Sequence, residues 1–410
     1  MFDRPPRKPE FLSWTYVALW SGLIFATVPF VRDAVDYVQE QWGGGAFTYG
    51  VTGIVVLVSA AAVALLLKRR RKSVAGYAWL LGIAGLVVYL SFEFKARSPV
   101  EAVHFLQYGI LSLLLYRAFS HRVRDYSIYA AATVAGTIVG MIDETVQWLT
   151  PGRQFEVRDI WLNLTAVALV QLALAAGIRP KIVSGWPDGA SLQRLCRLGA
   201  VAVAYLGLCY LNTPERIAWY TAHIPLLNFI DYNRSLMTEY GYLHGDATTG
   251  LFRSRLTAEE LRRFAKDRAE EGARILDRYR DREQYREFLD IYTPVTDPFL
   301  HEAKVHLFSR NVNLERARSK NSDKDFPRAY RENRILEDYF GELLHASNNQ
   351  WPAAVEAEAR EHVLTDQTYE SRVSHYLITG LSERQVFWLF LSALVGLLLL
   401  AGYFGKRTRG

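Results

Sequence analysis

Long apolar runs separated by short charged segments fill the first half of the chain, and one more such run lies near its end. Runs of about 18 or more residues with almost no charge predict transmembrane helices, because about 20 helical residues cross the hydrocarbon core of a bilayer. The long runs cover residues 14–31, 47–67, 74–92, 102–119, 126–149, 160–178 and 386–404. An eighth run, 198–211, is short enough to be a buried or interfacial segment instead of a span.

Basic residues between these runs predict the orientation of the spans, because cytoplasmic loops of membrane proteins carry an excess of Lys and Arg. With a cytoplasmic amino terminus, the basic segments 68–72 (KRRRK) and 117–124 (RAFSHRVR) both fall inside. If 198–211 also crosses, the tail GKRTRG falls inside as well. We therefore expect about eight spans in the cell membrane, with both termini cytoplasmic and residues 213–385 outside the cytoplasm.

Residues 213–385 are mostly polar, and their periodicity predicts helices. Thr257 and Glu260 form a capping box, which begins one long amphipathic helix with apolar residues at helical spacing as far as Leu289. The segment YTPVTDP then breaks this helix. A second helix is predicted around residues 330–344.

Three shorter segments of the same region have their own patterns. A third helix is predicted after NNQWP, where Pro352 suits the first helical position. The segment AKVHLFS, 303–309, is compatible with a short strand. The aromatic stretch RIAWYTAHIPLLNFIDY, 216–232, is typical of a segment along the outer membrane interface.

These elements predict an all-α fold: a polytopic membrane helical bundle of about eight transmembrane helices, with a mainly helical extracytoplasmic domain inserted before the last span. The expected divisions are two N-terminal transmembrane helices (1–73), a four-helix membrane core (74–178), a cytoplasmic loop with the seventh span (179–212), the extracytoplasmic domain (213–385), and the last span with a basic cytoplasmic tail (386–410).

Composition argues against a nucleic-acid-binding protein and against a disulfide-rich extracytoplasmic domain. The net charge of +6 does not indicate nucleic-acid binding, because the basic residues of the membrane half lie where the topology already requires them. The two cysteines, Cys196 and Cys209, lie at or inside the seventh span. The extracytoplasmic domain therefore has no disulfide framework, although its compartment permits one.

One stretch between two apolar runs, GMIDETVQWLTPGRQFEVRDIWLNLTA (140–166), concentrates charge. Helical spacing places Asp143 and Gln147 on one face and Asp159 and Asn163 on another, because residues four apart are neighbours on a helix. The fourth span adds His104 and Tyr108, also four apart, at the same depth in the membrane. The candidate site residues are His104, Tyr108, Asp143, Glu144, Gln147, Arg153, Arg158, Asp159 and Asn163.

Polar groups at this depth need a reason, since a charged side chain at the centre of a span costs roughly 2.5–3.5 kcal/mol and less near the interface. Several such groups persist together only if they pair, are hydrated or have a function. A simpler interpretation also stays open: Asp143, Glu144, Arg153 and Asp159 are outer-loop charges, or ion pairs that fix helix packing.

The order H-x3-Y, D-E-x2-Q, R, D-x3-N over residues 76–177 resembles the VanZ-like family of membrane proteins. Two positions depart from that pattern: Glu101 stands three before the histidine, where a basic residue is common, and Ala166 replaces a common glycine. The resemblance implies a helical membrane core and a role at the cell envelope, linked in such families to glycopeptide resistance. It implies no particular reaction.

Three functions are compatible with these residues. The first is binding of a lipid-linked or peptidoglycan-related ligand at the outer leaflet, in which Arg153 and Arg158 hold carboxylate or phosphate groups and Gln147 and Asn163 bond to amide or sugar groups. Residues 213–385 then complete the pocket or recruit an envelope protein partner. Envelope polysaccharide biogenesis is one context for such a ligand.

The second function is a membrane transferase or hydrolase with Glu144 or His104 as the catalytic base, and the third is a transporter. All candidates lie on the outer side, which disfavours a relay across the membrane. Neither a Ser/His/Asp order nor a Cys/His cluster is evident, so binding is the leading interpretation. We expect no cofactor and no metal: the histidines of HEAKVH, His301 and His306, are five apart, not four as in H-E-x-x-H.

Overall fold

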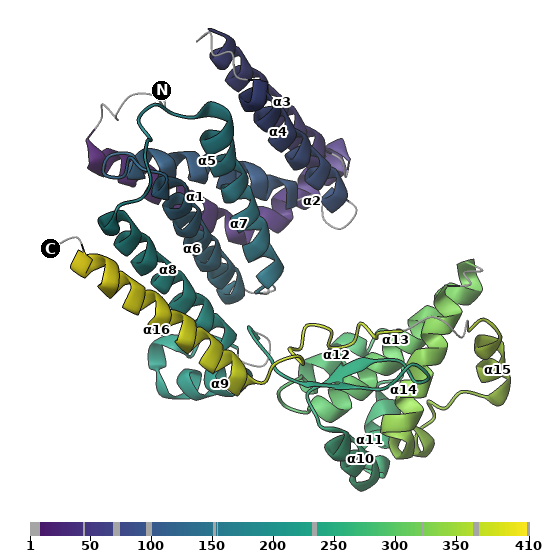
Figure 1. Ribbon diagram of the computed structural model, residues 1–410. Coiled ribbons are helices and arrows are strands. Elements are labelled where there is room, and N and C mark those ends of the chain that lie inside the picture. The colour runs from purple at the N-terminus through teal and green to yellow at the C-terminus, as the bar shows by residue number, and fades with distance from the viewer. Residues whose placement is uncertain are drawn as a thin grey trace. The chain divides into compact units, whose positions relative to one another are not determined.

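The computed structural model describes residues 9–43, 46–68, 74–95, 101–150, 153, 155–231, 236–320, 324–363 and 369–407. These residues form sixteen α-helices and a two-stranded antiparallel sheet (Figure 1). The chain divides into two compact units. We call Met1–Cys209 with Phe387–Gly410 the membrane unit, and Tyr210–Val386 the polar unit.

Each apolar run of the membrane unit forms a helix, as the sequence predicts. The helices are α1 (Glu10–Thr27), α2 (Val31–Trp42), α3 (Ala46–Lys68), α4 (Val74–Lys95), α5 (Glu101–Phe119), α6 (Ser127–Leu149), α7 (Val157–Leu172), α8 (Gly189–Tyr210) and α16 (Glu383–Arg407). A 3-10 turn, Val28–Phe30, joins α1 to α2, and a π-helical turn, Ala173–Ile178, extends α7. The amphipathic helix α2 was not expected from the sequence.

Five helical segments are long and apolar enough to cross a membrane, counted over the residues that the structure describes, and the chain is a multi-pass membrane protein. The segment 198–211 is not short: its helix begins at Gly189 and has 22 residues, because it continues past Arg194 and Arg197. The five segments are Glu10–Phe30, Val74–Glu93, Val157–Ile178, Gly189–Tyr210 and Glu383–Arg407.

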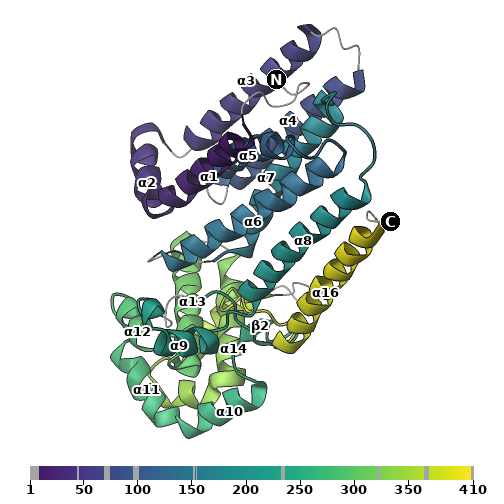
Figure 2. The same cartoon turned by 90° about the vertical axis from the view of Figure 1, so that its left-hand side faces the viewer.

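Helix α5 is the central helix of the membrane unit and packs against α1, α3, α4, α6 and α7 (Figure 2). Tyr108, Leu111 and Leu115 of α5 are at most 1% exposed. Its polar residues therefore face neighbouring helices, and this is why α5 tolerates them. Helices α8 and α16 run side by side (Figures 1 and 2), with Gly207 allowing the close approach of Phe390.

The polar unit is mainly helical, with one small sheet. Its elements are α9 (Pro214–His223), a 3-10 turn (Pro225–Leu227), β1 (Tyr242–His244), β2 (Phe252–Ser254), α10 (Ala258–Asp267), α11 (Ala269–Arg278), α12 (Tyr285–Ile291), α13 (Pro298–Lys320), α14 (Asp325–Ala346) and α15 (Ala353–Glu361). In the sheet, Leu243 pairs with Arg253. The helix expected around 330–344 is α14, and the aromatic stretch after α8 begins with α9, where Trp219 is exposed.

The long helix predicted from Thr257 to Leu289 is wrong in its length. The capping box is present, with the Glu260 backbone N–H donating to Thr257 and the Glu260 carboxylate accepting in return. The helix ends at Asp267, however, because Arg268 leaves the helical region of the backbone (φ −118°) and pairs with Asp297 at 2.6 Å. Three shorter helices, α10, α11 and α12, result, and each buries its own apolar face.

The short strand suggested for AKVHLFS is also wrong, since these residues lie inside α13. Leu300, Ala303 and Leu307 follow each other at helical spacing and are all buried, a pattern that a strand does not produce. The third predicted helix is α15, but it begins at Ala353, so Pro352 caps it instead of occupying its first position.

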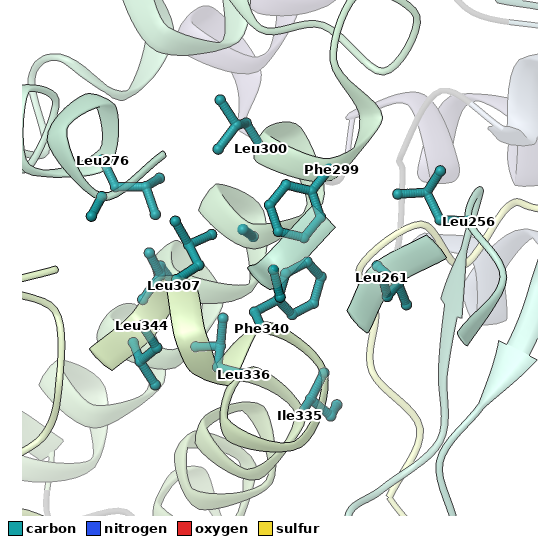
Figure 3. Close-up of a cluster of buried hydrophobic side chains, with 14 of the residues drawn as sticks. Leu256, Leu261, Leu276, Phe299, Leu300, Leu307, Ile335, Leu336, Phe340 and Leu344 are labelled. Atoms are coloured by element: carbon teal, nitrogen blue, oxygen red, sulfur yellow. The ribbon is translucent and has the colours of Figure 1, made fainter. Parts of the chain in front are cut away.

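The core of the polar unit lies where α10, α11 and α12 cover the antiparallel pair α13 and α14. Figure 3 shows Phe299 and Phe340 facing each other at its centre, with ring centroids 5.4 Å apart. Gly272 brings α11 close, because a Cβ there would lie 2.6 Å from Leu343 Cδ1. This packed core gives α13 and α14 a fixed position.

Candidate functional site

Helix α5 contributes two of the expected site residues, His104 and Tyr108, one turn apart. Tyr108 is fully buried, and its hydroxyl donates a hydrogen bond of 3.1 Å to Asp143 Oδ2 on α6. The rings of His104 and Tyr108 stack with their centroids 6.2 Å apart. The four-residue spacing thus turns both side chains toward α6 and α7, as the sequence predicts.

Helix α6 contributes three buried residues near its carboxyl end: Asp143, Glu144 and Gln147. The Gln147 amide donates to Glu144 Oε1 at 2.8 Å and lies 3.5 Å from Asp143 Oδ2. Glu144 is 0% exposed. A buried carboxylate needs hydrogen-bond donors, and Gln147 supplies one from the next turn of the same helix.

The loop after α6 and the start of α7 complete the hydrogen bonds. The Arg153 guanidinium donates to Gln147 Oε1, and the backbone N–H of Glu156 donates to Glu144 Oε2 at 3.1 Å. On α7, Asn163 Oδ1 accepts from His104 Nδ1 at 2.9 Å. These bonds bring together His104, Tyr108, Asp143, Glu144, Gln147, Arg153 and Asn163, which we call the polar cluster.

Two expected residues lie at the edge of the polar cluster. Arg158 is exposed, and its Nε lies 3.7 Å from Asp159 Oδ1. Within the described part of the chain, Asp159 Oδ1 accepts no hydrogen bond. The second positive charge that the sequence suggested for the site is therefore beside Asp159 and not beside the carboxylates of α6.

Two buried atoms of the polar cluster have no hydrogen-bond partner among the described residues: Asp143 Oδ1, an acceptor, and Asn163 Nδ2, a donor. Buried polar atoms are nearly always satisfied in folded proteins, so each exception needs an explanation such as a ligand or an ordered water. A hydroxyl or an amide group satisfies such a pair, because each can donate and accept.

Close packing of α6 against α7 positions Asn163. A Cβ on Gly140 would lie 2.9 Å from Asn163 Cβ, and a Cβ on Gly136 would lie 2.8 Å from Val167 Cγ2. Small residues four apart let membrane helices approach closely. The four-residue spacing of Gly136 and Gly140 is a signal in the sequence that indicates this close approach.

A second polar contact, which was not predicted from the sequence, joins α5 to α7 further along both helices. Gln171 donates to Ser112 Oγ at 2.8 Å and to the Ser112 carbonyl at 2.9 Å, and both residues are buried. Ser112 continues the four-residue spacing of His104 and Tyr108, and Gln171 lies eight residues after Asn163. The four-residue spacing along both helices therefore indicates that Ser112 and Gln171 share the faces of the polar cluster.

No group of three or more His, Cys, Asp or Glu side chains in the described ranges is arranged to hold a metal ion. The two histidines of HEAKVH lie on α13 and bond to different partners outside this helix. His301 bonds to the Tyr292 carbonyl and His306 to Glu332. The polar cluster itself offers two carboxylates, two amides, one imidazole, one phenol and one guanidinium.

Comparison with known families assigns part of the membrane unit. The family model described as VanZ/LLP1 matches residues 13–176, which include every residue of the polar cluster. The match also includes α1, α2 and α3, which precede the region 76–177 where the sequence resemblance is visible. No curated protein matches the chain, and no solved structure does. The resemblance is confirmed: residues 13–176 of this chain are a VanZ/LLP1 family domain.

Proposed function

We propose that the VanZ/LLP1 domain binds the polar head of a lipid-linked or peptidoglycan-related envelope molecule at the polar cluster. The observation that carries this proposal is that two buried atoms, Asp143 Oδ1 and Asn163 Nδ2, have no hydrogen-bond partner in the described part of the chain. They lie within a cluster built from three helices and a loop. A structural ion-pair network gives no reason to leave a buried donor and a buried acceptor without partners.

The chemistry of the cluster fits such a ligand. Asp143 and Asn163 offer an acceptor and a donor, which a sugar hydroxyl or a peptide amide satisfies. Arg153 is partly exposed, and its planar guanidinium suits a phosphate or carboxylate. Envelope precursors carry hydroxyl, amide and anionic groups together on a lipid anchor.

The topology in this proposal has eight spans, with α3, α5 and α6 added to the five apolar segments. Helix α5 is enclosed by other helices, so its polar residues do not have to meet lipid. The basic segments 68–72 and 117–124 then lie in the cytoplasm with both termini. The polar cluster lies at the opposite ends of α5 and α6, at the outer leaflet, and the polar unit is extracytoplasmic.

A catalytic role is the second candidate, with Glu144 as a general base acting on a lipid-linked precursor. Its two carboxylate oxygens already accept bonds from Gln147 and from the Glu156 N–H. A general base must reach the proton that it removes, and Glu144 is fully buried, so the reacting group has to enter the cluster. Binding is the first candidate because the atoms without partners belong to Asp143 and Asn163 and not to Glu144. Resistance to a glycopeptide or polysaccharide biogenesis is a downstream consequence of either.

Mass spectrometry of lipid that copurifies with the protein tests the proposal. We expect Arg153→Ala to reduce the bound lipid about tenfold or more, because it removes charge-assisted hydrogen bonds of about 1.5–3 kcal/mol. Arg158→Ala is the matched control: it removes an arginine of the same segment that lies beside Asp159, and we expect wild-type lipid content.

Equal lipid content in Arg153→Ala and wild type, or an empty wild-type protein, contradicts the proposal. Adding Glu144→Gln to the comparison separates the two candidate functions. Retained lipid together with lost product formation identifies Glu144 as a catalytic residue, whereas unchanged lipid chemistry in all variants leaves binding as the function.

A further inference from the structure

A cavity of about 1130 Å³ opens in the polar unit between α13, α14 and the segment 369–373. Small-molecule sites in proteins usually have about 300–1,000 Å³, so this cavity has room for a ligand. Ser309, Val312 and Arg316 line it from one face of α13, because residues three and four apart share a helix face.

The lining of the cavity is positively charged. Its basic side chains outnumber its two carboxylates, Glu361 and Glu370, and Glu370 already pairs with Arg253 at 3.0 Å. A concave surface of one charge sign concentrates ions of the opposite sign. The basic side chains of the lining are Arg316, Lys324, Arg328, Arg331 and Arg372.

Arg331 is the unusual member of this set. It is 7% exposed, and it makes no hydrogen bond or ion pair with any other residue in the described ranges. Arg334, one turn further along α14, is paired with both Glu337 and Asp338 at 2.9 and 3.0 Å. Arg331 therefore has no carboxylate in contact among the described residues, unlike its neighbour. Its charge reaches Asp246, an exposed carboxyl whose pKa is lowered first by hydrogen bonds from Thr248 and Thr249 and also by Arg331.

The adjacent residue cannot supply that counter-charge. Glu332 is fully buried and already accepts hydrogen bonds from His306, Tyr369 and Ser371. Tyr369 itself lines the cavity, so its hydroxyl is held by Glu332 while its ring forms part of the wall. Arg331 therefore lines the cavity with no ion pair to a described residue.

We propose that this cavity is a second binding site, which holds a small molecule bearing an oxyanion group on the Arg331 guanidinium. Phosphate and carboxylate both match the planar, bidentate geometry of arginine. Phe308, Val312 and Val373 add apolar wall, so the body of the ligand carries apolar surface beside the anionic group. This site is separate from the polar cluster, and it gives the polar unit a ligand of its own.

Calorimetric titration of the full-length protein in detergent tests the proposal, with inorganic pyrophosphate as the phosphate probe and citrate as the carboxylate probe. Ionic strength is held constant with sodium chloride, because exposed charges are screened by salt. We expect saturable binding of at least one probe, and the better probe identifies the oxyanion. Arg331→Met is expected to weaken that binding at least about tenfold, which corresponds to losing a charge-assisted hydrogen bond.

Arg334→Met is the matched control, because it removes the same charge from the same helix one turn away, where Arg334 is already paired. We expect its binding to equal that of the wild type, and Arg331→Lys to retain part of it. Hydrogen exchange of α14 in the unliganded variants checks that Arg331→Met is folded. If the wild type binds neither probe, or if folded Arg331→Met and Arg334→Met bind equally well, the assignment of this site is wrong.

Discussion

Glu332→Leu is expected to lower the free energy of unfolding of the polar unit by about 3–5 kcal/mol, which is the usual cost of removing one partner from a buried ionic network. Glu332 is 0% exposed and accepts bonds from His306 Nδ1 at 2.6 Å, the Tyr369 hydroxyl at 2.6 Å and the Ser371 hydroxyl at 2.7 Å. Leucine fills the space but accepts none of them. Because Ser309 Oγ also donates to Glu332 at 3.2 Å, four donors then lose their acceptor.

The same carboxylate makes the stability of the polar unit depend on pH. Burial raises the pKa of Glu332, but the charge of His306 and the hydrogen bonds from His306, Tyr369 and Ser371 outweigh burial, so the pKa is lowered overall. A lowered pKa stabilises the fold fully above the ordinary glutamate pKa of about 4.3, and this contribution is lost as pH falls through the folded-state value. We expect this loss on acidification in the wild type and not in Glu332→Leu.

Amide hydrogen exchange of α13 and α14 in the full-length protein measures both effects, because the chain has two units and a single melting curve does not separate them. Glu342→Leu is the control: Glu342 is an exposed glutamate of the same helix, and surface substitutions usually change stability by less than about 0.5 kcal/mol. Equal protection in the two variants contradicts a structural role for the Glu332 network.

Gly140→Ala has the second largest expected effect, a loss of about 1–3 kcal/mol in the membrane unit through overpacking. The new methyl group would lie 2.9 Å from Asn163 Cβ and 3.2 Å from Asn163 Nδ2. Helix α7 has to move away from α6 to relieve this contact. We therefore expect Asn163 to lose its bond to His104 and the copurified lipid to fall with it.

Gly109→Ala is a matched control within the same unit. A Cβ at Gly109 would lie 3.7 Å from Val170 Cγ2, which is ordinary contact, and alanine is the better helix former by up to about 1 kcal/mol. The amide hydrogen-exchange protection of α7 in the two purified variants in detergent should therefore shift in opposite directions, falling in Gly140→Ala and rising in Gly109→Ala. A Gly140→Ala protein as stable as Gly109→Ala, with wild-type lipid, is inconsistent with tight packing of α6 on α7.

Two patterns in the sequence predict which helices, and which faces of them, carry the residues of the polar cluster. Apolar runs of span length locate α5, α6 and α7, and the four-residue spacing of His104 with Tyr108 and of Asp143 with Gln147 assigns their faces. The pairing of His104 with Asn163, however, depends on which helices are neighbours and how far each is rotated. These are properties of tertiary packing, and no local pattern contains them.

The polar unit was harder to predict for the same reason. The apolar period from Leu261 to Leu289 continues through Arg268, although the backbone bends there to pair Arg268 with Asp297. In α13, the buried polar residues Lys304 and His306 interrupt the apolar pattern, and their partners, the Tyr279 carbonyl and Glu332, are distant in sequence. Residues buried by long-range partners therefore hide the helical period.

Cross-linking of His104→Cys with Asn163→Cys tests most directly whether α5 and α7 meet at one level. Cys196 and Cys209 are first replaced by serine, and a short bifunctional thiol reagent is applied to native membranes. His104→Cys with Trp161→Cys is the control, because Trp161 lies at the same end of α7 but is 63% exposed. Selective cross-linking of the first pair is the predicted result. Failure of the first pair to cross-link, or equal cross-linking of both pairs, contradicts the convergence of the three helices on one site.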